Sequence, residues 1–61
     1  MSKQRIATRL RELSQEAQSI AVDMDYYGGF SEWVQHSKEL TNAAYTLLQW
    51  AGEIEDEIEG E

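Results

Sequence analysis

The 61-residue sequence contains no cysteine and no proline, and it has one histidine and five basic residues against twelve acidic ones. The absence of cysteine excludes a disulfide framework and cysteine-ligated metal, and it is typical of a reducing compartment, so we expect a cytoplasmic protein. The single histidine, His36, follows Trp33 by three residues, where di-metal helical bundles carry a glutamate. We therefore expect neither a metal nor another cofactor.

Catalytic chemistry is not indicated either. A catalytic site needs a nucleophile, a base and an orienting group. Ser37 adjoins His36, but neighbours on a helix point about 100° apart and do not meet. The acidic end, residues 53–61, lacks the alternating Asp/Asn ligands and the central glycine of a calcium loop. No apolar run approaches the ~18 residues of a membrane span. The sequence predicts a protein that is neither an enzyme nor embedded in a membrane.

Two long segments free of strong helix breakers flank Gly28 and Gly29. In each segment, apolar or small residues recur at alternating spacings of three and four, which is the pattern of a helix with one continuous seam. The seams are Ile6, Leu10, Leu13, Ala17, Ile20, Met24 and Tyr27, and Trp33, Ser37, Leu40, Ala44, Leu47, Ala51, Ile54 and Ile58. This pattern predicts an all-α fold, an antiparallel hairpin with a helix over about residues 3–27, a turn over 28–30 and a helix over about 31–58.

Charge is distributed unevenly over this single domain of residues 1–61, which has a formal net charge of −7. Four of the five basic residues lie among the first eleven positions, and six of the twelve acids lie in the C-terminal end, residues 53–61. An antiparallel hairpin brings the two clusters together, with residues whose numbers sum to about 58 to 60 facing each other. Arg5 is then expected near Glu53, and such exposed pairs select the helix orientation more than they add stability.

A hairpin of this size does not bury enough apolar surface to be stable alone. An extended chain of 7.0 kDa exposes roughly 10,000 Å², of which about 60% is buried in a compact fold. If a little over half of that area is apolar, burial contributes about 85 kcal/mol at ~25 cal/mol per Å², whereas ordering the residues costs roughly 90 kcal/mol. Since disulfides and metals are missing, self-association remains, and we expect a homodimer that forms a four-helix bundle.

The second predicted helix supplies most of the expected dimer interface, because its apolar residues extend well beyond its seam. Large and small residues alternate along that seam, which lets four helices interdigitate. The first helix adds a strip of small residues, Ala7, Ser14 and Ala21, where another helix could approach closely. The residues expected at the dimer interface are Trp33, Val34, Leu40, Ala44, Leu47, Leu48, Trp50, Ala51 and Ile54.

In its size, its hairpin pattern and its alternation of small and large layers, the chain resembles the repressor-of-primer family of plasmid copy-number regulators, which are RNA-binding dimers of helical hairpins. The resemblance is architectural and covers most of the chain. It implies RNA binding by the outer face of the first helices, which in that family carries lysine and an exposed aromatic residue. The corresponding positions here, with one base and no aromatic among them, are Thr8, Arg11, Gln15, Gln18 and Val22.

These features favour a small, acidic, non-enzymatic interaction or regulatory protein that acts as a homodimer and binds a further protein. Very small, acidic, cysteine-free helical chains are common among phage and plasmid accessory proteins, which bind proteins of their host. Exposed aromatic and basic residues are frequent anchors of such contacts. The candidates for partner binding are Tyr45, Trp50, Arg5 and Arg9.

Two alternative functions stay open. The first is an acidic mimic of nucleic acid that blocks a nucleic-acid-binding protein. Its carboxylates would be those of residues 53–61 and of Glu12, Glu16, Asp23 and Asp25. The second is an RNA-binding hairpin dimer, although the net negative charge opposes direct binding to a phosphate backbone. Its basic contacts would be Lys3, Arg5, Arg9 and Arg11.

Overall fold

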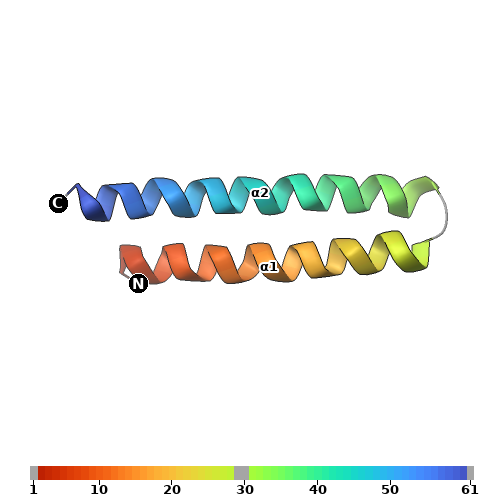
Figure 1. The fold of residues 1–61 in the computed structure, drawn as a ribbon, viewed down its shortest axis with the longest axis horizontal. Helices are drawn as coiled ribbons and strands as arrows, with labels where there is room; N and C mark the ends of the chain where they lie inside the picture. Colours follow the sequence, from red (N-terminus) through yellow and green to blue (C-terminus); the bar gives the residue numbers. More distant parts are fainter. Residues whose placement is uncertain (1, 29–30, 61) are drawn as a thin grey trace.

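The structure, a computed structural model, describes residues 2–28 and 31–60, which form two α-helices. Helix α1 spans Lys3–Gly28 and helix α2 spans Ser31–Glu59. The helices run antiparallel and side by side, so that the two ends of the chain lie at the same end of the molecule (Figure 1). The predicted all-α hairpin is confirmed, and the helices end within one residue of the expected positions. The predicted turn residues 29 and 30 lie outside the described residues.

Local hydrogen bonds define the start of α1 and the end of α2. The backbone N–H of Arg5 donates to the hydroxyl oxygen of Ser2 (3.1 Å), and that of Ile6 donates to the Ser2 carbonyl oxygen (3.1 Å). Ser2 is therefore the N-cap residue of α1, and it satisfies one of the free N–H groups of the first turn. At the other end, the N–H of Gly60 donates to the carbonyl oxygen of Asp56 (3.0 Å).

The two helices contact each other through small side chains. The buried residues are Ala7, Ser14, Ala17 and Ala21 on α1, and Ser37, Ala44 and Ala51 on α2. These residues include two rows with a seven-residue repeat, which are Ala7, Ser14 and Ala21 on α1, and Ser37, Ala44 and Ala51 on α2. A row with this repeat stays on one side of its helix when the two helices coil around each other. Small residues in these rows let the two backbones approach closely, and they leave no space for large side chains between the helices.

A buried hydrogen bond defines the register of the two helices. The Ser14 hydroxyl donates to the carbonyl oxygen of Ala44 (2.8 Å), and it accepts a hydrogen bond from Nε2 of Gln18 (3.1 Å). Ser14 and Ala44 therefore lie level with each other, so facing residues have numbers that sum to about 58. This is the register predicted from the sequence. The two rows of small residues consequently face each other residue by residue.

The predicted ion pair between Arg5 and Glu53 is not formed in the described part of the chain. Arg11 contacts Glu55 instead. The reason is the position of the contact surface on α1. Arg5 precedes Ala7 by two residues, so it lies about 200° round the helix and points away from α2. Arg11 follows Ala7 by four residues and lies on nearly the same side of α1.

Packing through small residues leaves the large members of both predicted seams half-buried or exposed in the hairpin. Leu13 is 51% exposed, Ile20 is 47% exposed and Trp33 is 55% exposed. The strip of small residues that was expected to admit another helix is covered by α2 of the same chain. The hairpin by itself therefore has a thin core made of alanine and serine side chains.

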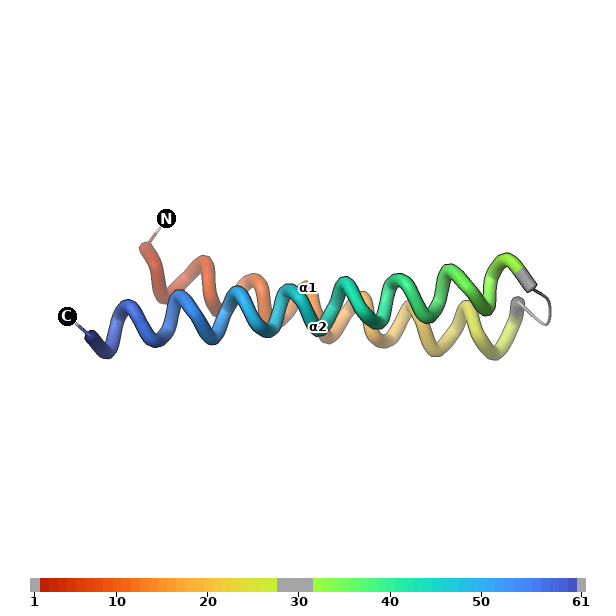
Figure 2. The backbone as a smooth tube through the Cα atoms, turned by 90° about the horizontal axis from the view of Figure 1, so that it is seen from above, coloured from red at the N-terminus to blue at the C-terminus, as the bar shows by residue number. Residues whose placement is uncertain are grey.

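The molecule is a thin rod that measures 48 × 14 × 13 Å, with a radius of gyration of 14.1 Å. The two helices cross at a shallow angle near their middle and separate toward the chain termini (Figure 2). Neither helix, over the residues that the structure describes, has the length and apolar character needed to cross a membrane.

Candidate functional site

The hairpin has two broad sides, one polar and one apolar. Arg11 and Glu55 meet on one side of the contact between the helices, and Asp25 and Thr41 line a groove on that same side. We call this side the polar face. On each helix, the large seam residues lie at least about 100° round the helix axis from the residues of the polar face. They therefore occupy the opposite side of the hairpin. This apolar face consists of Ile6, Leu10, Leu13, Ile20 and Met24 of α1 and Trp33, Leu40, Leu47, Trp50 and Ile54 of α2.

The apolar face is the most extensive candidate site on the described part of the molecule. None of its residues is fully buried, and Trp50 is 50% exposed, in line with the exposure of Leu13 and Trp33. Single apolar side chains are normal on a protein surface, whereas a continuous apolar patch usually marks an interface. This one follows both helices along the rod, so its shape suits a partner that is itself elongated.

A hollow of about 360 Å³ lies on the α1 half of the apolar face, and it is lined by Ile6, Arg9, Leu10 and Leu13. Three of these side chains are aliphatic. Arg9 borders them with a long apolar stem that ends in a guanidinium group. An aromatic side chain suits such a hollow, because its edge contacts the aliphatic groups while its ring face attracts the cation.

The polar face carries an ion pair that joins the two helices. Nε of Arg11 donates to Oε2 of Glu55 (3.0 Å), and Nη2 of Arg11 donates to Oε1. These hydrogen bonds, together with the opposite charges, hold the pKa of Glu55 below its usual value and raise the pKa of Arg11. Both side chains are about half exposed, so solvent screens the attraction. The guanidinium of Arg11 is thus engaged within the chain.

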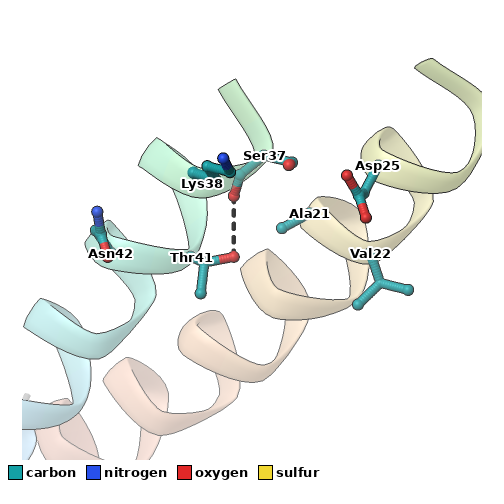
Figure 3. Close-up of a pocket in the computed structure, with 7 residues that line it drawn as sticks. All are labelled: Ala21, Val22, Asp25, Ser37, Lys38, Thr41 and Asn42. Carbon is teal, nitrogen blue, oxygen red and sulfur yellow. Dashed lines mark hydrogen bonds between the residues drawn. The ribbon is translucent and has the colours of Figure 1, made fainter. Parts of the chain in front are cut away.

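A groove of about 310 Å³ lies between the helices on the polar face (Figure 3). Asp25 stands on its α1 wall and Lys38 on its α2 wall, while Ala21 points across it toward Ser37 and Thr41. The hydroxyl of Ser37 donates to the carbonyl oxygen of Val34 (2.7 Å), and that of Thr41 donates to the carbonyl oxygen of Ser37 (2.9 Å). Both hydroxyl protons are engaged by backbone, so neither oxygen is activated as a nucleophile.

The nine residues expected at a dimer interface lie on three different surfaces. Those on the apolar face are Trp33, Leu40, Leu47, Trp50 and Ile54. Ala44 and Ala51 are fully buried by α1 of the same chain, and they have no exposed surface left for a second copy. Leu48 precedes Glu55 by seven residues and therefore lies on the polar face, as does Val34. Of the nine residues, only those on the apolar face lie on the same surface as Leu13.

The four residues expected to bind a protein partner do not form one cluster. Tyr45 and Trp50 are five residues apart on α2, so they point about 140° apart. Tyr45, which is 58% exposed, lies toward the polar face, whereas Trp50 belongs to the apolar face. Arg9 borders the hollow of the apolar face. Arg5 points away from α2 on a third side of the rod.

His36 makes one exposed contact, in which its Nδ1 lies 3.4 Å from Oε1 of Glu39 on the same helix. Across residues 2–28 and 31–60, no group of three or more histidine, cysteine, aspartate or glutamate side chains is arranged to hold a metal ion.

Sequence reasoning missed the α1 contribution to the apolar face and the pairing of Arg11 with Glu55. Both have the same cause. The prediction placed the large seam residues of α1 against α2, whereas α1 contacts α2 through the row of Ala7, Ser14 and Ala21. The signal was present in the sequence, since an alanine and serine row with a seven-residue repeat on each helix is typical of closely packed antiparallel helices.

Comparison of the chain with protein-family models, with curated proteins and with solved structures finds no match.

Proposed function

We propose that the protein is a non-enzymatic interaction protein that acts as a homodimer, in which the apolar faces of two hairpins pack together as a four-helix bundle. The observation that carries the proposal is the exposure of Leu13, Ile20 and Trp33 along one side of the rod. Burial of apolar surface is the main favourable term in folding and association, and the alanine and serine core between α1 and α2 supplies little of it. A second copy has the same unburied surface, and a two-fold dimer buries both surfaces at once.

The surface area of the rod matches what a stable dimer requires. The chain exposes 4766 Å², whereas a compact monomer of 7.0 kDa exposes about 4,000 Å². The excess, roughly 700 Å², is close to the ~800 Å² that each partner buries in an interface of standard size. The radius of gyration of 14.1 Å likewise exceeds the roughly 10 Å of a compact chain of this length.

In this proposal the dimer binds another protein through the surfaces that dimerisation leaves accessible. The polar face keeps Tyr45 and Val22 exposed among polar side chains, and tyrosine is a frequent anchor of protein interfaces. Direct binding to nucleic acid is less favourable, because the net charge of −7 per chain repels a phosphate backbone. The engagement of Arg11 by Glu55 reduces the basic surface further.

The test compares charge substitutions on the two faces of α1. The variant Leu13→Glu with Ile20→Glu places two carboxylates on the apolar face, and Val22→Glu is the control, because Val22 is exposed on the polar side of the same helix. Light scattering at micromolar concentration gives the mass, and far-UV circular dichroism gives the helix content. We expect a dimer for the wild type and for Val22→Glu.

We expect the double variant to be monomeric and to lose helix content, because charged residues cannot be buried unpaired in an apolar interface. A wild-type chain that is monomeric and fully helical at this concentration would overturn the proposal. A double variant that stays as dimeric as the Val22→Glu control would overturn the assignment of the apolar face as the interface.

A further inference from the structure

We propose that the two hairpins of the dimer point the same way, related by a two-fold axis along the rod, so that Trp50 of each copy fills the hollow beside Arg9 of the other. This inference rests on the proposed homodimer and adds its topology. In this arrangement each α1 lies on the α2 of the other copy, and every helix has two antiparallel neighbours.

The register of the two helices sets the levels of the hollow and of Trp50 along the rod. The hydrogen bond between Ser14 and Ala44 fixes which residues of the two helices are level. By this register, Trp50 of α2 is about level with Thr8 of α1. The hollow is lined by residues from Ile6 to Leu13, so it lies at the same level as Trp50. A large protruding side chain and a hollow thus occur side by side on one face, one on each helix.

Symmetry decides whether the two features meet. A two-fold axis along the rod keeps every residue at its level and places α2 of one copy over α1 of the other, so Trp50 comes to lie over the hollow, and the contact occurs twice. A two-fold axis across the rod reverses the levels and places α1 over α1 and α2 over α2. With this axis at the middle of the rod, Trp50 would face the region of His36 on α2 of the other copy, and the hollow on α1 would stay without an aromatic side chain.

The chemistry of the hollow fits the indole ring of Trp50. Ile6, Leu10 and Leu13 offer aliphatic contacts, and tryptophan is the side chain that interacts most strongly with a nearby cation such as Arg9. Trp50 is half exposed in the hairpin, so it has surface available for the contact. The same axis brings Leu47 over Leu13, so the large residues of the two faces interleave level by level.

The charged residues at the edges of the two packed apolar faces also favour an axis along the rod. Glu16 of α1 lies about level with Ala43 of α2, and Asp23 lies about level with His36. An axis along the rod therefore brings Asp23 of each copy beside His36 of the other, and it puts no two acids opposite each other at these levels. An axis across the rod instead brings Glu16 close to its own symmetry copy.

Disulfide trapping tests the topology, because the chain has no cysteine of its own. The probe is the variant Glu16→Cys with Ala43→Cys, and each single variant is a control. Glu16 lies about 200° round α1 from Ser14 and so points away from α2, which prevents a bridge within one hairpin, since a disulfide needs Cα atoms within about 7 Å. The variants are oxidised by air at micromolar concentration, and covalent dimers are resolved on non-reducing gels.

We expect the double variant to be trapped as a covalent dimer at least about tenfold faster than either single variant, because only an axis along the rod brings residue 16 of one copy to residue 43 of the other. Faster trapping of the single variant Ala43→Cys would indicate an axis across the rod and would overturn the inference. A double variant that dimerises by light scattering without being trapped would overturn it as well. Monomeric wild-type protein, by contrast, would count against the homodimer itself.

Discussion

The Ser14 hydroxyl donates a hydrogen bond to the carbonyl oxygen of Ala44, 2.8 Å away on the facing helix, and both residues are fully buried. This contact lies at the middle of the rod, where the two rows of small residues meet. It determines which residues of α1 and α2 are level, and it explains why Leu13, the neighbour of Ser14, points out of the hairpin. The candidate interface is thus a consequence of how closely the two helices pack.

Replacing Ser14 is expected to destabilise the protein in proportion to the size of the new side chain. Ser14→Ala removes the hydrogen bond to Ala44 and leaves the amide of Gln18 without this acceptor, so we expect a loss of about 1 kcal/mol in the free energy of unfolding. Ser14→Leu must be accommodated between closely packed helices, and we expect a larger loss, about 2–3 kcal/mol. Urea denaturation measures both, with Ser19→Ala, an exposed serine of the same helix, as the control. Equal stability of the leucine variant and the wild type would contradict the close packing.

Gly52 is expected to be a weak point of α2 that alanine repairs. A Cβ atom at Gly52 has nothing within 4 Å, and the residue lies in the interior of the helix. We expect Gly52→Ala to increase the free energy of unfolding by about 0.5–1 kcal/mol, because alanine loses less backbone freedom on folding. Urea denaturation provides the value. A loss of stability would show that another chain approaches the polar side of α2 at this position.

The ion pair of Glu55 with Arg11 is expected to contribute a pH-dependent part of the stability. Because Arg11 lowers the pKa of Glu55 in the folded chain, the contribution is present above the unfolded pKa of the carboxyl group and is lost as the pH falls through the folded pKa. We expect Glu55→Gln to have a lower thermal midpoint than Glu53→Gln at about pH 7, and we expect the difference to vanish near pH 2. Circular dichroism melts at both pH values provide the test. A difference in thermal midpoint that persists at about pH 2 would show that Glu55 contributes through packing and not through its charge.

Trp50 and Tyr45 are expected to separate dimerisation from partner binding. We expect Trp50→Ala to raise the dissociation constant of the dimer by about 30-fold or more, since an aromatic anchor buried in an interface pocket contributes about 2 kcal/mol or more. Tyr45→Ala should leave the dimer unchanged, because Tyr45 lies on the other side of α2. Sedimentation velocity over a dilution series measures both. Similar weakening by the two substitutions would contradict the division into faces.

The same pair of variants tests the proposed interaction function. We expect Tyr45→Ala to reduce the capture of a protein partner from a lysate of the native host, while the dimer remains intact. Trp50→Ala, measured at a concentration where the dimer still forms, should retain capture. The reverse pattern would place the partner on the apolar face.

Most of the fold could be predicted from the sequence. The absence of proline, the position of Gly28 and Gly29 and the alternating spacing of apolar residues were enough to predict two helices and an antiparallel hairpin, because these signals are local. The register was also predictable, because a hairpin that turns at residues 28–30 places residues whose numbers sum to about 58 to 60 opposite each other. The antiparallel orientation was predictable from charge, since it brings the basic N-terminal segment and the acidic end, residues 53–61, together.

The contact surface on α1 could not be predicted in the same way. Hydrophobic periodicity identifies the side of a helix that carries large apolar residues, and it does not say whether that side faces the other helix of the same chain or a different molecule. Here Ala7, Ser14 and Ala21, beside the seam, pack against α2, and Leu13 and Ile20 remain outside. The ion pair of Arg11 was missed for the same reason.

The most direct test of the account is the mass of the wild-type chain by sedimentation equilibrium over a dilution series, read together with its helix content. We predict a species of about 14 kDa, twice the 7.0 kDa of one chain, at micromolar concentration, with helix content falling as dilution dissociates it. A fully helical species of 7.0 kDa that stays unchanged on dilution would contradict the account.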